Sequence, residues 1–346
     1  ASVRTADFNA WDGNEDELRA EGVRIFGPGA STSQDLEPEY ITVANNSRTA
    51  WVAMQEANAL AVVDIKSATV TDILPLGTKD HSLPGNELDA SNRDGAINIT
   101  NWPVKGFYMP DAITSYNIDD TTYIVSANEG DSRDYDGFSE EERIKDLVLD
   151  PVAFPDAATL QEDENLGRLN STTVNGDTDG DGDFDELYSY GARSFSIWSS
   201  EGELVYDSGA DFEKKTAVLL PEDFNSNNDE NDSFDARSDD KGPEPEGVVL
   251  GKIKGSIYAF IGLERIGGIM VYDITNPYDV QYVTYVNNRD FSVDAEIDGK
   301  TNPMVGDLGP EGLVFIPASR SPNRKPLLVT GNEVSGTTTV FQINVE

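Results

Sequence analysis

The sequence contains no cysteine and a single histidine, His81, among its 346 residues. The lack of cysteine excludes disulfides, thiolate metal ligands and cysteine nucleophiles. One histidine cannot supply a zinc site that needs three. The sequence also lacks an apolar run of membrane-spanning length and a recognisable signal peptide, so we expect no membrane insertion.

Basic residues are scarce as well. Lys and Arg number 25 against 64 Asp and Glu, which gives a formal net charge of −39 at pH 7. Such a charge repels nucleic acid, so we expect no nucleic-acid partner. Two compatible interpretations of the acidity stay open: solubility in salty surroundings, and binding of several divalent cations.

One short pattern occurs four times: proline, an acid, any residue and an aliphatic residue. A second acid follows the first after 17 to 22 residues of mostly strand-forming sequence. Repetition at intervals of tens of residues is typical of a repeat architecture. The first acids are Glu39, Asp111, Glu246 and Glu311, and the second acids are Glu56, Glu129, Glu264 and Glu333.

Each motif opens a unit of short apolar segments separated by turn residues. In the first unit the segments are residues 40–43, 50–54, 59–65 and 69–76. Units of about forty residues with four strands are typical of a β-propeller. We therefore expect an all-β chain that forms a single domain over residues 1–346. The units span residues 38–76, 108–208 with an insertion at 131–192, 245–286 and 310–346.

The unit count suggests an incomplete ring. The last unit has three strands, and residues 2–8 look like an outer strand without a unit of their own. The chain also starts with Ala1 rather than methionine, which is typical of a processed product. We expect about four blades here, with further blades on the N-terminal side.

The segment 177–185 has the sequence DTDGDGDFD. Acids at loop positions 1, 3, 5 and 9 and a glycine at position 6 are typical of a calcium loop. We expect Asp177, Asp179, Asp181, Asp183 and Asp185 to hold Ca²⁺. Tyr188 stands where an EF-hand has its helical Glu, so the loop is not an EF-hand.

The acids of the four motifs are candidate metal ligands. A propeller gathers equivalent residues near its axis, where Glu39, Glu56, Asp111, Glu246, Glu311 and Glu333 would hold one or more hard cations. The cation is most simply Ca²⁺, or else another divalent or trivalent metal. The alternative is that each acid caps a turn of its own unit. Glu129 and Glu264 lie beside Arg133 and Arg265, and these four are the candidate catalytic residues.

Long segments of the chain resemble the choice-of-anchor I family. They are DLEPEYI at 35–41, ANEGDSRDY at 127–135, SDDKGPEPEG at 238–247 and GLERIGG at 262–268. The resemblance implies an exported bacterial β-propeller of about seven blades, related to mesenchyme-specific cell-surface glycoproteins and often labelled alkaline phosphatase-like. It also implies that an N-terminal fragment of the same precursor completes the ring, and that the protein is secreted, periplasmic or on the cell surface.

Two functions remain open from the sequence. One is a metal-dependent phosphoesterase acting on a small phosphorylated substrate, with ring carboxylates holding the metal and arginines neutralising the phosphate. The other is a non-enzymatic, calcium-stabilised surface or matrix binding protein. The second function is supported by the Asp-rich loop, the high net negative charge and the lack of any nucleophile motif.

Overall fold

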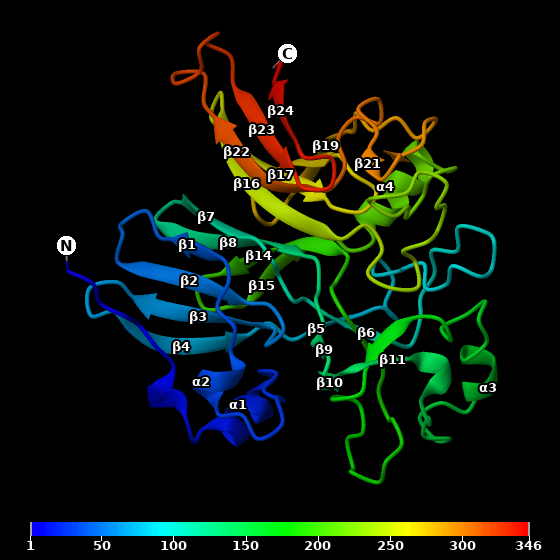
Figure 1. Cartoon of the computed structure of the whole chain (residues 1–346). Helices are drawn as coiled ribbons and strands as arrows, with labels where there is room; N and C mark the ends of the chain where they lie inside the picture. The colour runs from blue at the N-terminus through cyan, green and yellow to red at the C-terminus, as the bar shows by residue number, and fades with distance from the viewer. Residues whose placement is uncertain (1, 345–346) are drawn as a thin grey trace.

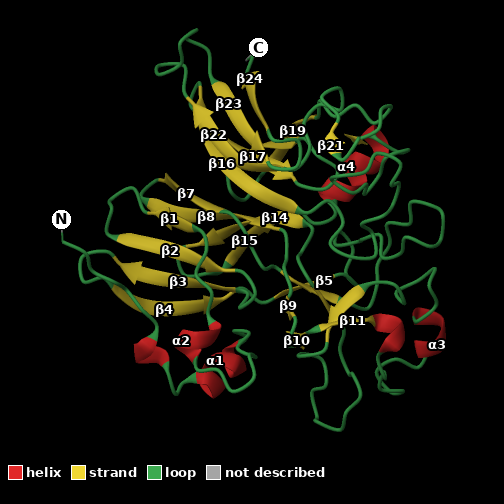
Figure 2. Ribbon diagram, viewed as in Figure 1, coloured by secondary structure: helices red, strands yellow, loops and turns green. Residues whose placement is uncertain are grey.

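The structure is a computed structural model that describes residues 2–344, and it consists mainly of antiparallel β-sheets (Figures 1 and 2). Three sheets have four strands, and a fourth has three. We call them sheets 1 to 4 in chain order. Within each sheet the strands follow one another in sequence order.

Sheet 1 comprises β1 (Ile41–Val43), β2 (Thr49–Met54), β3 (Ala59–Asp64) and β4 (Thr69–Pro75). Sheet 2 comprises β7 (Ile113–Ile118), β8 (Thr121–Asn128), β14 (Ser194–Ser199) and β15 (Leu204–Asp207). Sheet 3 comprises β16 (Pro245–Ile253), β17 (Ser256–Leu263), β18 (Ile269–Asp273) and β19 (Gln281–Val286). Sheet 4 comprises β22 (Pro310–Ile316), β23 (Leu327–Asn332) and β24 (Thr337–Gln342).

The first strands of successive sheets are neighbours. Strand β1 contacts β7, β7 contacts β16, and β16 contacts β22. Figure 1 shows the four sheets in succession from the blue to the red end of the chain. The expectation of an all-β chain is confirmed, and most expected strands lie within one or two residues of the observed ones.

The core lies between successive sheets, because apolar side chains alternate along the strands and so face the neighbouring sheet. At the interface of sheets 2 and 3, the fully buried Phe195 of β14 lies 4.8 Å from the Tyr272 ring of β18. Smaller clusters join sheet 1 to sheet 2 around Trp51 and Trp198, and sheet 3 to sheet 4 around Phe260 and Leu328.

The N-terminal segment covers the free face of sheet 1. Leu18 of α1 (Glu15–Glu21) and Leu36, after α2 (Thr32–Asp35), pack with Met54 of β2. The expectation of an outer strand at residues 2–8 is wrong: residues 2–7 form no strand, and Phe8 is buried in this cluster. A few apolar residues in an alternating pattern do not distinguish a strand from a packed coil.

The insertions form small sheets and helices beside the four main sheets. One three-stranded sheet joins β5 (Thr78–Asp80), β6 (Lys105–Phe107) and β13 (Tyr188–Ser189). The two-stranded pairs are β9 (Asp134–Tyr135) with β10 (Phe138–Ser139), β11 (Glu141–Arg143) with β12 (Asn170–Thr172), and β20 (Glu296–Ile297) with β21 (Lys300–Thr301). The remaining helices are η1 (Asn9–Trp11), η2 (Ile144–Asp146), α3 (Ala157–Leu160) and α4 (Asp211–Leu219).

A stack of cations and aromatic rings fastens the insertion to the N-terminal segment. Neighbouring members lie 4.5 to 5.5 Å apart, measured from a cation or ring centre to the next ring centroid. Its members in order are Arg133, Phe26, Arg24, Phe107, Tyr188 and Lys105. Contacts of this kind contribute about 0.5–2 kcal/mol each when desolvated, so the stack stabilises the attachment of the insertion to the N-terminal segment.

No helix among residues 2–344 combines the length and the apolar composition that crossing a membrane requires.

The sheet interface gives a first prediction. Replacing Phe195 with alanine removes a fully buried ring, so we expect the free energy of unfolding to fall by about 3–5 kcal/mol. Denaturant titration followed by circular dichroism measures this. Val218→Ala on the exposed face of α4 is the control, since that side chain is 79% exposed and its loss should change stability by less than about 0.5 kcal/mol. Equal effects of the two changes would contradict the placement of the core.

Candidate functional site

The four Pro-acid motifs occupy the same place in the four sheets. In each sheet, the residue three positions after the motif proline pairs with the second strand of the same hairpin. The pairs are Ile41↔Val52, Ile113↔Ser126, Val248↔Ile261 and Leu313↔Thr330. The first acids therefore lie at equivalent positions, just before these pairs.

The same register corrects one assignment of the second acids. We count three residues onward from the second-strand member of each pair. This position holds Glu129, Glu264 and Glu333 in sheets 2 to 4, but Gln55 in sheet 1. Glu56 is therefore not the equivalent of Glu129, and the expected equivalence is wrong by one residue. The error arose because sequence spacing alone cannot resolve a one-residue shift between hairpins.

The first acids lie within electrostatic reach of one another. Burial, reinforced by Glu129, Glu264, Asp111 and Glu311, raises the pKa of Glu246 to about 10. Burial, followed by the charges of Glu129 and Glu311, raises the pKa of Asp111 to about 7.

Glu39 belongs to the same group. Burial, followed by the charges of Glu56 and Asp111, raises its pKa to about 7. Glu311 is exposed, but its charge contributes to the shifts at both Asp111 and Glu246. The pKa shifts indicate that Glu39, Asp111, Glu246 and Glu311 lie within electrostatic reach of one another, and we call these four residues the first-acid ring. Among the described residues, no three of these carboxylates lie within 4.8 Å of one another.

The first-acid ring has no basic side chain bonded to it. Within residues 2–344, none of its carboxylates makes an ion pair or accepts a side-chain hydrogen bond. The Oε2 atom of Glu246 is buried and has no hydrogen-bond partner. Lys241 is the only cation that lowers the pKa of Asp111, and it does so without contact. Carboxylates in this situation are protonated or bind a cation.

The second acids have a different environment, since protein cations lie between them. Lys241 Nζ lies 2.8 Å from Glu129 Oε1 and 3.0 Å from Glu244 Oε2. Arg265 Nε lies 2.9 Å from Glu244 Oε2 and 3.2 Å from Glu264 Oε2. We call this alternating series, from Glu129 to Glu264, the charge chain.

Amide side chains close both ends of the charge chain. Gln55 Nε2 donates to Glu129 Oε2 over 3.0 Å, so sheet 1 is linked to sheet 2 at the site. Asn228 Nδ2 donates to Glu264 Oε1 over 2.6 Å. Carboxylate oxygens of Glu129, Glu244 and Glu264 lie within 4.8 Å of one another, which is metal-ligand spacing. Lys241 and Arg265 lie between these oxygens, although burial still raises the pKa of both Glu129 and Glu264.

Glu244 is the centre of the charge chain and is fully buried. Burial is the largest influence on its pKa and favours the protonated form. The charges of Lys241, Arg237 and Arg265 outweigh burial and lower the pKa of Glu244 to about 2. Glu264, with one guanidinium partner, keeps a pKa raised to about 8 by burial and by the nearby Glu244 charge.

Arg133 and Arg265, the expected phosphate-binding residues, both have carboxylate partners. Arg133 is buried, its Nη1 lies 2.8 Å from Asp35 Oδ1, and its Nη2 donates to the Asp35 carbonyl. Arg265 binds Glu244 and Glu264 and also donates to Asn228 over 3.1 Å. Their expected catalytic roles, with those of Glu129 and Glu264, stay predictions.

Glu56 acts on the first-acid ring through Glu39, whose pKa its charge raises. Glu56 is buried beside Arg133 and Glu37, its Oε2 has no hydrogen-bond partner, and burial raises its pKa. Glu333 is exposed, and its backbone N–H donates to the Gly309 carbonyl. Their expected role as metal ligands stays a prediction.

The Asp-rich loop divides into two overlapping carboxylate groups. Asp177, Asp179 and Asp185 form one group, and Asp183, Asp185 and Asp150 form the other, each within 4.8 Å. Asp181 belongs to neither, and its Oδ1 accepts from the Asp183 N–H over 3.1 Å. Desolvation, followed by the charges of Asp181 and Asp150, raises the pKa of Asp183 to about 6.

Sequence analysis missed several residues of these clusters. Asp150 reaches the loop because Leu149 pairs with Phe184, a long-range contact that leaves no local pattern. Glu244 lies one residue before the third motif proline, but only the fold shows that three cations surround it. Gln55 became visible once the strand register was known.

Comparison with known proteins identifies the family. Residues 1–277 match the choice-of-anchor I domain. The chain belongs to the choice-of-anchor I domain family. It is 31% identical over 191 residues to Gigasin-3a of Magallana gigas, covering 54% of this chain and 67% of that protein.

A second relative is a mesenchyme-specific cell surface glycoprotein of Strongylocentrotus purpuratus, 29% identical over 286 residues. This match covers 72% of the chain but 36% of the glycoprotein, so the chain spans about a third of that relative. The family resemblance drawn from the motifs is confirmed, whereas no match supports the alkaline phosphatase-like label.

Solved structures are only distantly similar. Hydrazine synthase of Kuenenia stuttgartiensis shares 13% identity at a TM-score of 0.27, covering 92% of this chain and 86% of that one. Periplasmic gluconolactonase of Pseudomonas aeruginosa shares 12% identity at a TM-score of 0.27, covering 94% and 86%. Likenesses at this level carry no functional argument.

The charge chain gives a second prediction. Replacing Lys241 with methionine leaves Glu129 and Glu244 without their shared ammonium, so we expect the free energy of unfolding at pH 7 to fall by about 3–5 kcal/mol. Denaturant titration measures the loss. Lys252→Met removes an exposed ammonium of β16 and should change stability by less than about 0.5 kcal/mol. A Lys241→Met protein as stable as the wild type would show that the charge chain contributes nothing.

Proposed function

We propose that the chain is a secreted or cell-surface binding module, without catalytic activity, whose first-acid ring holds a divalent cation. The observation that carries the proposal is that, among the described residues, no basic side chain is bonded to Asp111 or Glu246, whose pKa values burial and neighbouring acids raise. A bound cation would supply the missing positive charge and keep these groups ionised.

The ligand chemistry favours Ca²⁺. The first-acid ring offers only carboxylate oxygens, and Ca²⁺ prefers six to eight oxygen ligands in a flexible arrangement. Asp111, Glu246 and Glu311 would hold the ion, with Glu39 on the sheet 1 side. The orphaned Glu246 Oε2 fits this role, since it is buried and has no other partner.

The Asp-rich loop is proposed as a second calcium site. Asp177, Asp179 and Asp185 already lie within 4.8 Å of one another, and Asp183 and Asp150 extend the group through Asp185. Because this loop belongs to the long insertion between β8 and β14, bound Ca²⁺ there would order the insertion.

The binding role has more support than the phosphoesterase role. A phosphoesterase needs free cationic groups beside its metal to neutralise the phosphate oxygens. Arg133 donates to Asp35, and Lys241 donates to Glu129 and Gly130. Arg265 forms an ion pair with Glu244 and donates to Asn228. These donors are already engaged by the protein.

The surface location and the full ring are parts of the same proposal. The family and the cell surface glycoprotein relative support a secreted or surface protein. The succession of sheets 1 to 4 supports part of a β-propeller, with an N-terminal fragment of the same precursor as the partner that completes about seven blades.

The third prediction concerns calcium. At Ca²⁺ a hundredfold above Kd, a single site adds about 2.7 kcal/mol, or roughly 5 °C in the thermal midpoint. We expect Glu246→Gln to lose the contribution of the first-acid ring and Asp177→Asn that of the loop, so each variant retains part of the shift. Glu201→Gln, at an exposed acid in the β14–β15 turn, should retain all of it.

Calorimetry with and without EDTA measures the shift. No change in midpoint with Ca²⁺ would contradict the proposal. Chelator-sensitive hydrolysis of p-nitrophenyl phosphate by the wild type, lost in Glu246→Gln, would instead establish the phosphoesterase.

The fourth prediction concerns pH. In the metal-free folded chain, burial and like charges raise the pKa values of Asp111 and Glu39 to about 7, Glu264 to about 8 and Glu246 to about 10. The unfolded chain releases these protons near pH 4. Between pH 4 and the raised pKa values, the folded state therefore binds more protons than the unfolded state. We expect the free energy of unfolding to fall as pH rises above about 5.

Glu244 has the opposite dependence. Its folded pKa of about 2 gives stability above pH 4.5 that is lost as pH falls toward 2. Urea titrations from pH 2 to 9 in EDTA test both pH dependences. Glu246→Gln should reduce the fall in the free energy of unfolding at high pH, whereas Glu201→Gln should leave that fall unchanged. Stability that rises steadily to pH 9 without metal would contradict the described ring.

A further inference from the structure

Sheet 4 has a free edge. Sheets 1 to 3 each have four strands, whereas the described residues supply sheet 4 with three, so β24 (Thr337–Gln342) is its outer strand. Its six residues include no proline and no charged side chain, the usual protections of an exposed edge. The outward backbone groups of β24 can therefore pair with another strand.

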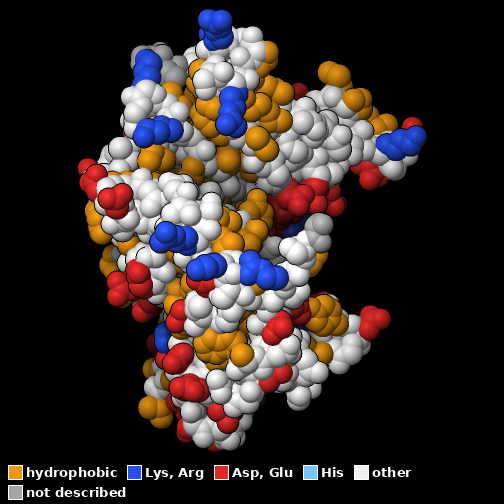
Figure 3. All heavy atoms as spheres, turned by 90° about the vertical axis from the view of Figure 1, so that its left-hand side faces the viewer, with side chains coloured by type: hydrophobic (Ala, Val, Ile, Leu, Met, Phe, Trp, Pro, Cys, Tyr) orange, Lys and Arg blue, Asp and Glu red, His pale blue; other side chains and the backbone are white. Residues whose placement is uncertain are grey.

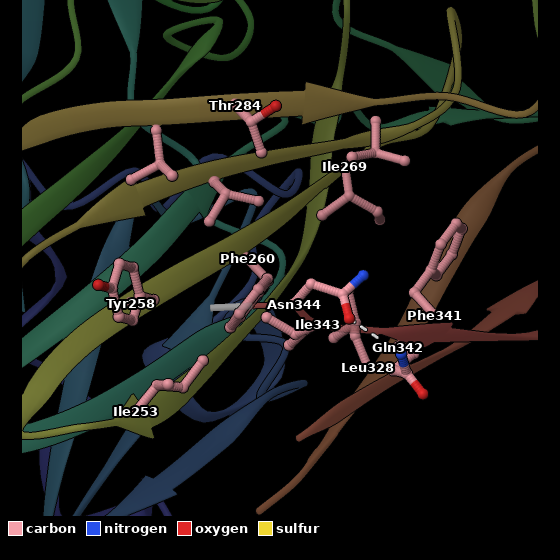
Figure 4. Close-up of a pocket in the computed structure, with 13 residues that line it drawn as sticks. Ile253, Tyr258, Phe260, Ile269, Thr284, Leu328, Phe341, Gln342, Ile343 and Asn344 are labelled. Atoms are coloured by element: carbon pink, nitrogen blue, oxygen red, sulfur yellow. Dashed lines mark hydrogen bonds between the residues drawn. The ribbon is translucent and has the colours of Figure 1, made fainter. Parts of the chain in front are cut away.

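An apolar groove runs beside this edge. It has a volume of about 520 Å³ and lies between sheet 3 and the end of β24 (Figure 4). Phe260, Ile269 and Val271 of sheet 3 form its floor, and Leu328 and Phe341 of sheet 4 form one wall. Among the described residues, no Asp, Glu, Lys or Arg lines the groove, although 26% of the chain is charged.

Outer-strand residues of sheet 3 lie exposed along the groove. Val283 and Val286 of β19 line it and are 48% and 41% exposed. At the interface between sheets 2 and 3, the outer strands of sheet 3 cover sheet 2. Tyr272 of β18 and Tyr285 of β19 pack with the core that includes Phe195 of sheet 2. Within residues 2–344, sheet 4 has no fourth strand to cover Val283 of sheet 3 as sheet 3 covers sheet 2.

We propose that the groove is a docking site for one extended strand of another polypeptide, which pairs antiparallel with β24 and becomes the fourth strand of sheet 4. Alternate apolar side chains of that strand would enter the groove, and its backbone would bond to the β24 edge. The proposal is independent of the cation chemistry of the first-acid ring.

The occupant comes from outside residues 2–344. The N-terminal segment cannot reach the site, because Phe8 is buried against sheet 1 and Arg4 donates to the Ile65 carbonyl. A second copy is disfavoured, since each chain carries a net charge of −39 and two copies repel each other.

Charge at one end of the groove defines the occupant further. The end of β16 carries Lys252, and the β22–β23 loop carries Arg320, Arg324 and Lys325, all exposed. Figure 3 shows Lys and Arg side chains gathered at the top of the molecule, where Figure 1 places sheet 4. The chain just after β24 lies near Lys325, whose Nζ is 3.5 Å from Asn344 Oδ1. A strand that pairs antiparallel with β24 would begin at this end, and the basic residues here favour an acid at its start.

The chain itself offers a probe for this site. Residues 279–287, DVQYVTYVN, begin with Asp279 and include β19, the fourth strand of sheet 3. We expect an acetylated, fluorescent peptide of this sequence to bind the full chain and to slow amide exchange within residues 337–342. The same peptide with proline in place of its central threonine should bind at least about tenfold more weakly.

Two exposed valines make a matched pair of variants. Val283→Asp places a charge in the groove and should weaken peptide binding at least about tenfold. Val314→Asp, on β22 at the opposite edge of sheet 4 from β24, is 57% exposed and outside the groove, and it should change binding less than about twofold. Val286→Asp repeats the test should Val283→Asp fail to fold.

Three outcomes would overturn the proposal: no binding at millimolar peptide, binding that Val283→Asp and Val314→Asp alter equally, or self-association of the chain that protects residues 337–342 without peptide. The last would make the occupant a second copy.

Discussion

The need to neutralise buried carboxylates governs the centre of this molecule. Four sheets direct equivalent acids toward one region, and a buried carboxylate cannot stay charged without a partner or a hydrogen-bond network. The protein meets this need in two ways. The charge chain uses Lys241 and Arg265 between Glu129, Glu244 and Glu264, whereas Asp111 and Glu246 of the first-acid ring have no bonded cation. The charge chain therefore has protein cations between its carboxylates, and the first-acid ring has none bonded to it among the described residues.

The surrounding fold holds these groups in place. The Phe195–Tyr272 interface fixes sheet 2 against sheet 3, and Gln55 joins sheet 1 to Glu129. The cation–aromatic stack through Arg24 and Phe107 fastens the insertion to the N-terminal segment. Charged groups of the site therefore belong to several sheets and loops, and their geometry depends on the packing of the whole chain.

Local sequence was sufficient for most of the strands. In sheet 1, alternating apolar residues and turn residues such as Asn46 and Ser47 placed all four strands within about a residue of the observed ones. The motif prolines placed the first acids correctly, because equivalent hairpins repeat the same register. The family match over residues 1–277 agrees with the resemblance drawn from the same motifs.

Long-range contacts were beyond the reach of the sequence. Spacing suggested Glu56 where strand register places Gln55, and nothing near Asp150 indicates its approach to Asp183. The helices around Leu18 were not expected either, since a short helix covering a sheet leaves a weak pattern. The partners of Arg133 and Arg265 likewise depend on residues distant in sequence, which is why both looked available for a substrate.

A crystal structure of the protein grown with Ca²⁺, with anomalous data, tests the central claim most directly. The account predicts an anomalous peak between the Asp111 and Glu246 carboxylates at calcium–oxygen distances of about 2.3–2.6 Å. It also predicts no peak inside the charge chain, where Lys241 and Arg265 already supply the positive charge. Carboxyl groups of Asp111 and Glu246 hydrogen-bonded to each other, with no ion between them, would contradict it.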